Sequence, residues 1–308
     1  MTALVGVASH LPPGVPIASL QEELGLTDTQ LRRFHRLYGL SEVCRSEEGE
    51  VELLLAAAGK LAELAGQEHR VKYVVRARTV TTTAPYPDSP LLTARDALGL
   101  RHASTFTVSD HACASGLLAV DLCGTLLAAD GDPDALALVL MGEKAFSQSV
   151  RMIPDVAIMG EAAAAVLVGP GTAQDRMLGY ATRSYGREDA AVVMSPEVAA
   201  QFRQIYGDGL AEVMREATRA AGLELSDVDI VLPHNVNTIS WTRAAAAMGL
   251  DPKRVFLDNV PVTGHCFCAD PFLNYRTAHD LGVLAPGQRY LMTSVGLGST
   301  FSAMLFEH

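Results

Sequence analysis

The stretch FTVSDHACASGLLAVDLCG, at residues 106–124, decides the fold. Residues 105–109 are mostly β-branched and aromatic and favour a strand, whereas the Ala- and Leu-rich run at 116–129 favours a helix. The sequence therefore predicts a tight strand-to-helix turn that contains Cys113. The neighbours of this cysteine are small: Ala112, Ala114, Ser115 and Gly116.

The position of Cys113 suits a nucleophile. Free N–H groups and the positive end of the dipole at a helix start favour thiolate over thiol, and the small neighbours leave room for a bulky acyl group on the sulfur. The alternative is a buried apolar cysteine, which is the commoner fate of this residue type. His111, two residues earlier, could tune the thiol or face solvent.

The rest of the chain alternates short apolar runs with helical stretches, which predicts an α/β fold. The strand candidates are apolar on both faces, as in a sheet covered on both sides; they lie at 71–75, 135–141, 162–168, 228–233, 289–295 and 302–307. Helices are expected at 51–65, 115–129, 207–221 and 238–248. The order of elements recurs, so we expect a duplicated unit with halves 1–170 and 171–308, joined near 169–175.

A duplication would bring the ends of matching strands together. His234 follows the strand candidate at 228–233, and His265 lies in NVPVTGHCFCAD at 259–270, which predicts a second strand-to-helix turn after a strand near 256. We therefore expect both histidines beside Cys113. One can accept and donate protons, and the other can donate to a developing oxyanion.

Two further clusters have a functional and a structural interpretation. Gly296 and Gly298 follow a strand and let a backbone N–H approach a ligand, or they form an ordinary hairpin turn. His265 with Cys266 and Cys268 is a weak zinc signal, because no second cysteine pair accompanies it. Small buried residues behind the histidine are the preferred interpretation, so we expect no metal and no cofactor.

Composition excludes several classes of protein. With 308 residues, of which 49 % are hydrophobic, the chain can bury a large core, and its net charge of −11 disfavours a nucleic-acid binder. The N-terminus has no basic leader region, and no apolar run of about 18 residues predicts a membrane span. Five cysteines favour reduced thiols, so we expect a cytoplasmic protein that binds neither nucleic acid nor membrane.

Together these motifs resemble the β-ketoacyl-acyl-carrier-protein synthase III family of the thiolase superfamily. The matching segments are SDHACASG at 109–116, GEAAAAVLV at 160–168, LPHNVN at 232–237 and LAPGQRYLMTSVGLGSTFSAML at 284–305. The resemblance covers nearly the whole chain. It implies a thiolase-like duplicated αβαβα layered fold with two mixed five-stranded sheets, and an acyltransferase that works as a homodimer with joined sheets.

The resemblance also assigns roles. It implies that Cys113 is acylated, that His234 is the family's histidine, and that the backbone N–H groups of Cys113 and of Leu297 or Gly298 form the oxyanion hole. Like His111, Asn237 is a candidate for tuning the site. The donor would be an acyl-CoA or acyl-carrier-protein thioester.

Departures from the family pattern point to a specialised member. Gly264-His265-Cys266 replaces the family's Gly-Asn-Thr, so the set becomes Cys-His-His, as in elongating ketosynthases. The Trp- and Arg-containing segment for the CoA nucleotide is replaced by LRRFHRLYG at 31–39, and Arg243 is the only charged residue of the helix after His234. The candidate carrier-protein docking patch is therefore elsewhere: Arg32, Arg33 and Arg36, with Arg76 and Arg78.

Two acceptors remain open. The acyl group could pass to a malonyl-type thioester by decarboxylative condensation in polyketide or fatty-acid-like metabolism, which the resemblance favours slightly. It could instead pass to a hydroxyl or amine, giving an ester or amide. A non-catalytic partner subunit is a third possibility, but the retention of Cys113, His234 and His265 disfavours it.

Overall fold

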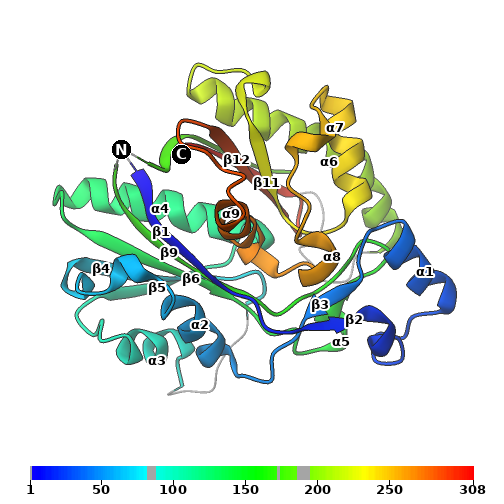
Figure 1. Ribbon diagram of the computed structural model, residues 1–308, viewed down its shortest axis with the longest axis horizontal. Coiled ribbons are helices and arrows are strands. Elements are labelled where there is room, and N and C mark those ends of the chain that lie inside the picture. The colour runs from blue at the N-terminus through cyan, green and yellow to red at the C-terminus, as the bar shows by residue number, and fades with distance from the viewer. Residues whose placement is uncertain (1, 82–87, 172–173, 186–194) are drawn as a thin grey trace.

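The core of the protein is a nine-stranded mixed sheet. We describe it from a computed structural model that covers residues 2–81, 88–171, 174–185 and 195–308. The strand order is β11-β12-β13-β10-β1-β9-β6-β4-β5 (Figure 1). In that order the strands are Ile230–Pro233, Arg289–Gly296, Thr300–Glu307, Arg176–Ser184, Thr2–His10, Ala163–Pro170, Leu136–Gly142, Val71–Ala77 and Ser104–Val108.

The sheet consists of two parts that are narrowly joined. β1 pairs with β9 along its length but meets β10 only at Ala3 and Arg176. Five strands lie on one side of this join and four on the other. The expected fifth strand near 256 is reduced to one bridge between Val231 and Val255, because the 3-10 helix Pro252–Arg254 and a turn occupy the chain there. The expectation of two five-stranded sheets was therefore wrong in this detail.

Helices and the two sheet parts form five layers, as the predicted αβαβα fold requires. The first part of the sheet packs on α2 (Glu50–Ala58) and α3 (Pro90–Ala97), and the second on α6 (Pro196–Ala220) and α7 (Thr238–Met248). Between the parts lie α4 (Ser115–Asp130) and α9 (Asp270–Asp280), with buried residues of both parts around them (Figure 1).

The remaining elements are short. Apart from 3-10 helices, they are α1 (Asp28–Arg36), α5 (Gln148–Arg151), α8 (Val260–Thr263), and the small strands β2 (Gly14–Pro16), β3 (Glu42–Cys44), β7 (Met152–Ile153) and β8 (Ala157–Ile158). The proposed boundary at 170/171 falls between β9 and β10. The duplication stays a prediction, and residues 172–173 of the expected joint lie outside the described part of the chain.

One segment, Ala112–Asp130, is long and apolar enough to cross a membrane by length and composition. It comprises α4 with the turn before it, and 61 % of its apolar window is buried inside the protein. Its composition therefore fits a central helix between two sheet layers, a role that is apolar on every side.

Candidate active site

Cys113 lies where the sequence places it. β5 ends at Val108, a 3-10 helix spans Ala112–Ala114, and α4 begins at Ser115. Ala112 has a φ of 46°, a left-handed conformation that a residue with a side chain seldom adopts. The hydroxyl of Ser294 donates to the carbonyl of Cys113 at 2.8 Å, which ties the turn to β12. The turn is thus held in place from the second part of the sheet.

Gly296 is required at the end of β12 by close packing. A Cβ atom there would collide with the backbone carbonyl oxygen of His111 and would press on Ala112. The glycine lets the strand end approach the turn that carries Cys113.

His265 reaches Cys113 directly. Its Nε2 lies 3.2 Å from the sulfur of Cys113, and both side chains are buried. The expected strand-to-helix turn was wrong, because His265 lies between α8 and the 3-10 helix Phe267–Ala269 and touches a strand-like segment only through a bridge to Met159. The expected proximity to Cys113 was correct.

A carboxylate that sequence reasoning missed stands behind His265. Oδ2 of Asp270, the first residue of α9, lies 2.5 Å from Nδ1 of His265. The same carboxylate accepts the backbone N–H groups of Asn235 at 2.5 Å and Cys266 at 2.7 Å. The only signal in the sequence was an acidic residue at a helix start five positions after the histidine.

Buried amides join the loops that carry the site. Asn274 of α9 donates to the carbonyl of Pro233 at 2.7 Å and to the side-chain oxygen of Asn235 at 2.8 Å, and it accepts from Asn259 at 2.8 Å. The side chain of Asn259 also donates to Thr277 at 3.0 Å. This network fixes the chain on both sides of His234 against α9, which carries Asp270.

His234 follows β11 directly, as expected, and is fully enclosed. Its Nε2 lies 3.2 Å from the hydroxyl of Tyr206 on α6, and its backbone carbonyl accepts the indole N–H of Trp241 at 2.9 Å. Its ring centroid is 6.0 Å from that of His265. Burial and the neighbouring charge of His265 lower the pKa of His234 to about 3, so this imidazole is neutral.

His265 has the opposite electrostatics. Burial opposes its charge, but the Asp270 carboxylate and the Cys113 sulfur outweigh burial and raise the pKa of His265 to about 10. The two histidines therefore differ in charge although both are buried. This divergence suits the two imidazoles to different chemical roles.

Cys113, His234 and His265 line one cavity of about 490 Å³. Its other walls come from the segment 153–156, from α6, from α7 and from the end of β12. The apolar wall residues include Ile153, Val156, Phe202, Val236, Ala244, Val295 and Leu297, and the polar ones include Arg203, Tyr206, Ser240 and Arg243. Such a cavity can hold an apolar acyl chain or ring beside the sulfur.

The secondary candidates lie in different surroundings. Leu297 lines the cavity beside Gly296, while Gly298 has a φ of 83° in the turn to β13. Asn237 caps α7 by accepting from the backbone N–H of Ser240 at 2.7 Å and donates to the carbonyl of Val156 at 2.9 Å, so these described hydrogen bonds position a helix. His111 is half-buried, and burial lowers its pKa.

The other four cysteines are buried. Burial raises the pKa of Cys44 and Cys123 to about 12 and raises that of Cys266 and Cys268 well above the usual value. Among the described residues, no group of three or more His, Cys, Asp and Glu side chains is placed to hold a metal ion. Both ring nitrogens of His265 already have partners, which weakens the zinc interpretation.

The arginine patch is smaller than expected. Arg32, Arg33 and Arg36 are exposed on α1, and Arg33 pairs with Asp155 at 3.1 Å, next to the cavity wall. Arg76 was wrongly included, because it is 2 % exposed and pairs with Glu50 at 3.0 Å. Arg78 is only 11 % exposed and faces the same carboxylate.

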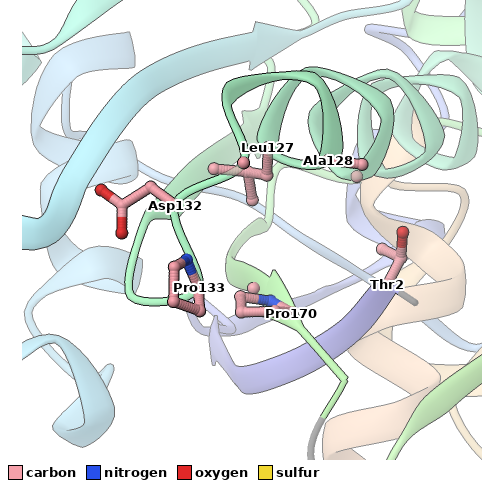
Figure 2. A pocket seen from close by; sticks show the side chains of 9 residues that line it. Thr2, Leu127, Ala128, Asp132, Pro133 and Pro170 are labelled. Carbon is pink, nitrogen blue, oxygen red and sulfur yellow. The ribbon is translucent and has the colours of Figure 1, made fainter.

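A second, smaller hollow lies at the far end of α4 from Cys113. It measures about 190 Å³, and Figure 2 shows Leu127 and Ala128 of α4 with Thr2, Asp132, Pro133 and Pro170 around it. About 13 residues of helix, or roughly 20 Å, separate it from the cysteine. It is therefore no part of the cavity that holds Cys113 and the two histidines.

Known proteins share this sequence pattern and architecture. Residues 218–308 match the sequence model of the family "3-oxoacyl-[acyl-carrier-protein (ACP)] synthase III C terminal". The β-ketoacyl-[acyl-carrier-protein] synthase III of Roseobacter denitrificans is 25 % identical over 99 % of this chain and 98 % of its own length.

Solved structures agree in fold. The 3-oxoacyl-[acyl-carrier-protein] synthase III of Aquifex aeolicus superposes with a TM-score of 0.84 at 20 % identity over the whole of both chains. The acyltransferase ChlB3 gives a TM-score of 0.85 at 18 % identity, covering 99 % of this chain and 97 % of its own. The layered fold, the family match over residues 218–308 and these full-length relatives together support a ketosynthase III-like member of the thiolase superfamily, and the names of the relatives are consistent with an acyltransferase.

Proposed function

We propose that the protein takes an acyl group from an acyl thioester onto Cys113 and passes it to a second substrate. The observation that carries this proposal is the 3.2 Å contact between the Cys113 sulfur and Nε2 of His265 on the wall of a largely apolar cavity. A cysteine with a base in contact and a cavity beside the sulfur is the arrangement that covalent acyl transfer needs.

The first half-reaction uses this pair. With its raised pKa, His265 holds the proton of Cys113, and the thiolate attacks the carbonyl carbon of the donor thioester. A carbon–sulfur bond to Cys113 forms, the bond to the donor sulfur breaks, and the leaving thiolate receives the proton from His265. The oxyanion formed on the way would meet backbone N–H groups at Cys113 and Leu297, as in an oxyanion hole.

The donor is an acyl-CoA or an acyl-carrier-protein thioester, as the family resemblance implies. Phe202, Val236 and Val295 on the cavity wall fit an apolar or aromatic acyl group. The exposed arginines of α1 lie near the wall segment at 153–156 through the Arg33–Asp155 pair, which supports α1 as a docking face for an acidic carrier protein.

Decarboxylative condensation with a malonyl-type thioester is one candidate for the second half-reaction. Two imidazoles with ring centroids 6.0 Å apart support it, because both could donate to the oxygen of the enolate that forms when carbon dioxide leaves. Transfer to a hydroxyl or amine is the other candidate, and it needs a base rather than a second donor.

Intact mass spectrometry tests the acyl-enzyme. After incubation with acetyl, hexanoyl, decanoyl and benzoyl thioesters of CoA, we expect one adduct that maps to Cys113 and is absent in Cys113→Ala. Cys266→Ala and Cys268→Ala are matched controls that keep the adduct. An adduct that survives in Cys113→Ala would refute the assignment.

A further inference from the structure

Asp270 has a feature that ordinary acyl transfer by Cys113 does not explain. Its carboxylate is completely buried, yet it binds no arginine or lysine among the described residues. Its three described partners are His265 and two backbone N–H groups. We propose that Asp270 is a positioning residue that makes His265 a general base, so that the acceptor is a hydroxyl or an amine. This proposal rests on the acyl-enzyme proposed above.

The hydrogen bonds fix the tautomer of His265. The backbone N–H groups of Asn235 and Cys266 can only donate, so the Asp270 carboxylate acts as an acceptor on both oxygens. Nδ1 of His265, 2.5 Å from the same carboxylate, must then carry a proton. When His265 is neutral, Nε2 is the unprotonated nitrogen, and it is the one that faces Cys113.

This tautomer suits the second half-reaction with an O–H or N–H acceptor. Once the donor thiol has left with the proton, His265 is neutral and its Nε2 holds a lone pair beside the acyl group. The acceptor loses its proton to Nε2 as its oxygen or nitrogen attacks the acyl carbon. The new ester or amide bond forms, the bond to Cys113 breaks, and the thiolate is left beside protonated His265.

The same tautomer suits condensation poorly. A malonyl thioester that loses carbon dioxide gives no proton to a base, and its enolate oxygen needs N–H donors. Neutral His265 presents a lone pair in that direction. His234 alone remains, and its Nε2 lies 3.2 Å from the hydroxyl of Tyr206. Transfer to oxygen or nitrogen therefore uses His265 in the tautomer that Asp270 fixes.

The groups around His265 come from several elements. Cys113 lies before α4, His234 follows β11, and Asp270 begins α9. Behind Asp270 are the thiols of Cys44 and Cys266 and the guanidinium of Arg45. Both thiols have raised pKa values because they are buried, so they stay neutral near pH 7. Asp270 is thus the carboxyl group that orients His265.

A deacylation assay tests the role of Asp270. The enzyme is acylated with benzoyl or hexanoyl N-acetylcysteamine thioester and freed of donor, and loss of the adduct is followed in water alone and with 2-phenylethanol or 2-phenylethylamine. We expect the wild-type rate to rise with pH as His265 loses its proton. In Asp270→Asn the acyl-enzyme should still form, while its deacylation falls about 10²- to 10⁴-fold, since a comparable change in a catalytic triad has an effect at the upper end of this range.

A double-mutant comparison separates positioning from folding. If Asp270 acts through His265, adding Asp270→Asn to His265→Asn should change deacylation less than about twofold. Equal effects of Asp270→Asn in both backgrounds would overturn the proposal. So would stoichiometric release of carbon dioxide from malonyl-CoA that Asp270→Asn leaves unchanged.

NMR of the wild type needs no variant. In the acyl-enzyme labelled with ¹⁵N-histidine, the spectrum is followed as pH rises until His265 is neutral, and we then expect its proton on Nδ1 and an unprotonated Nε2. A neutral His265 with the proton on Nε2 would refute the proposal. The failure of every donor to acylate Cys113 would instead refute the proposed function, so the two failures are distinguishable.

Discussion

Replacing Asn274 by leucine should weaken the positioning of His265 without changing any residue of the cavity wall. The amide of Asn274 is fully buried and makes three hydrogen bonds, to Pro233, to Asn235 and from Asn259. Leucine has a similar size and makes none of them. Because the backbone N–H of Asn235 binds Asp270, the change should also reach His265.

The size of the effect follows from the groups left behind. Two buried carbonyl oxygens, of Pro233 and of the Asn235 side chain, lose a donor, at about 1–3 kcal/mol each. Asn259 keeps its bond to Thr277, and burying leucine returns part of the loss. We therefore expect the free energy of unfolding to fall by about 2–5 kcal/mol, a large part of the roughly 5–15 kcal/mol typical of a protein domain.

Urea unfolding measures the stability, and the rate of adduct formation on Cys113 measures the site. We expect acylation to slow by about tenfold, as a misplaced base loses roughly 1.4 kcal/mol of transition-state stabilisation. Thr277→Val is the matched control on the same helix. It removes the bond from Asn259 at 3.0 Å and the bond to the carbonyl of Leu273 at 3.0 Å, should cost about 1 kcal/mol, and should leave the acylation rate unchanged.

The reasoning fails if Asn274→Leu unfolds within about 0.5 kcal/mol of the wild type, since a surface substitution has an effect of that size. It also fails if the variant is destabilised but acylates Cys113 at the wild-type rate. In that case the amide network supports the fold and has no influence on His265.

Three further predictions concern pH, assembly and docking. The pKa of His234 is lowered to about 3, so the free energy of unfolding should fall as pH drops below about 6.5, where the unfolded chain takes up the proton first. The raised pKa of His265 should make the free energy of unfolding fall also as pH rises from about 6.5 toward 10. Urea titrations across pH 4–9 measure both effects, and a flat profile would show that both pKa shifts are absent. β5 is an edge of the sheet, and Thr107 on it is exposed, so Thr107→Lys should convert the expected homodimer to monomer in light scattering, whereas a wild-type monomer would contradict the sheet-joining dimer. The exposed arginines Arg32 and Arg36 should speed acylation by a carrier protein, so charge reversal to Glu should slow it about three- to tenfold at low salt and little at high salt, with acyl-CoA as the control donor; equal rates would remove α1 from the docking face.

The sequence predicted the elements that have strong local signals. Apolar runs at 135–141 and 162–168 are β6 and β9, and small residues around Cys113 mark a turn that the structure confirms. The helix expected at 207–221 is the second half of the longer α6. Local patterns sufficed here because the apolar composition of each segment already indicates that it is buried, without knowledge of its distant neighbours.

Other features depend on packing between distant segments. β1 and β10 were not predicted as strands, although together they join the two parts of the sheet. The contact between His265 and Asp270 needs α9 to start directly after a 3-10 turn, and no hydrophobic period reveals such a start. Tyr206 reaches His234 from α6, 28 residues earlier in the chain, and only the folded structure brings them together.

Because the two parts of the sheet are narrowly joined, the contact between Cys113 and His265 depends on the position of one part relative to the other. Cys113 comes from the five-stranded side, whereas His234 and His265 come from the chain after β10, and the sheet itself links the sides at a single residue pair. A shift of about 1 Å between the sides would break the contact of sulfur and imidazole while leaving each side intact. Mild denaturant should therefore abolish acylation before circular dichroism registers any loss of helix or strand.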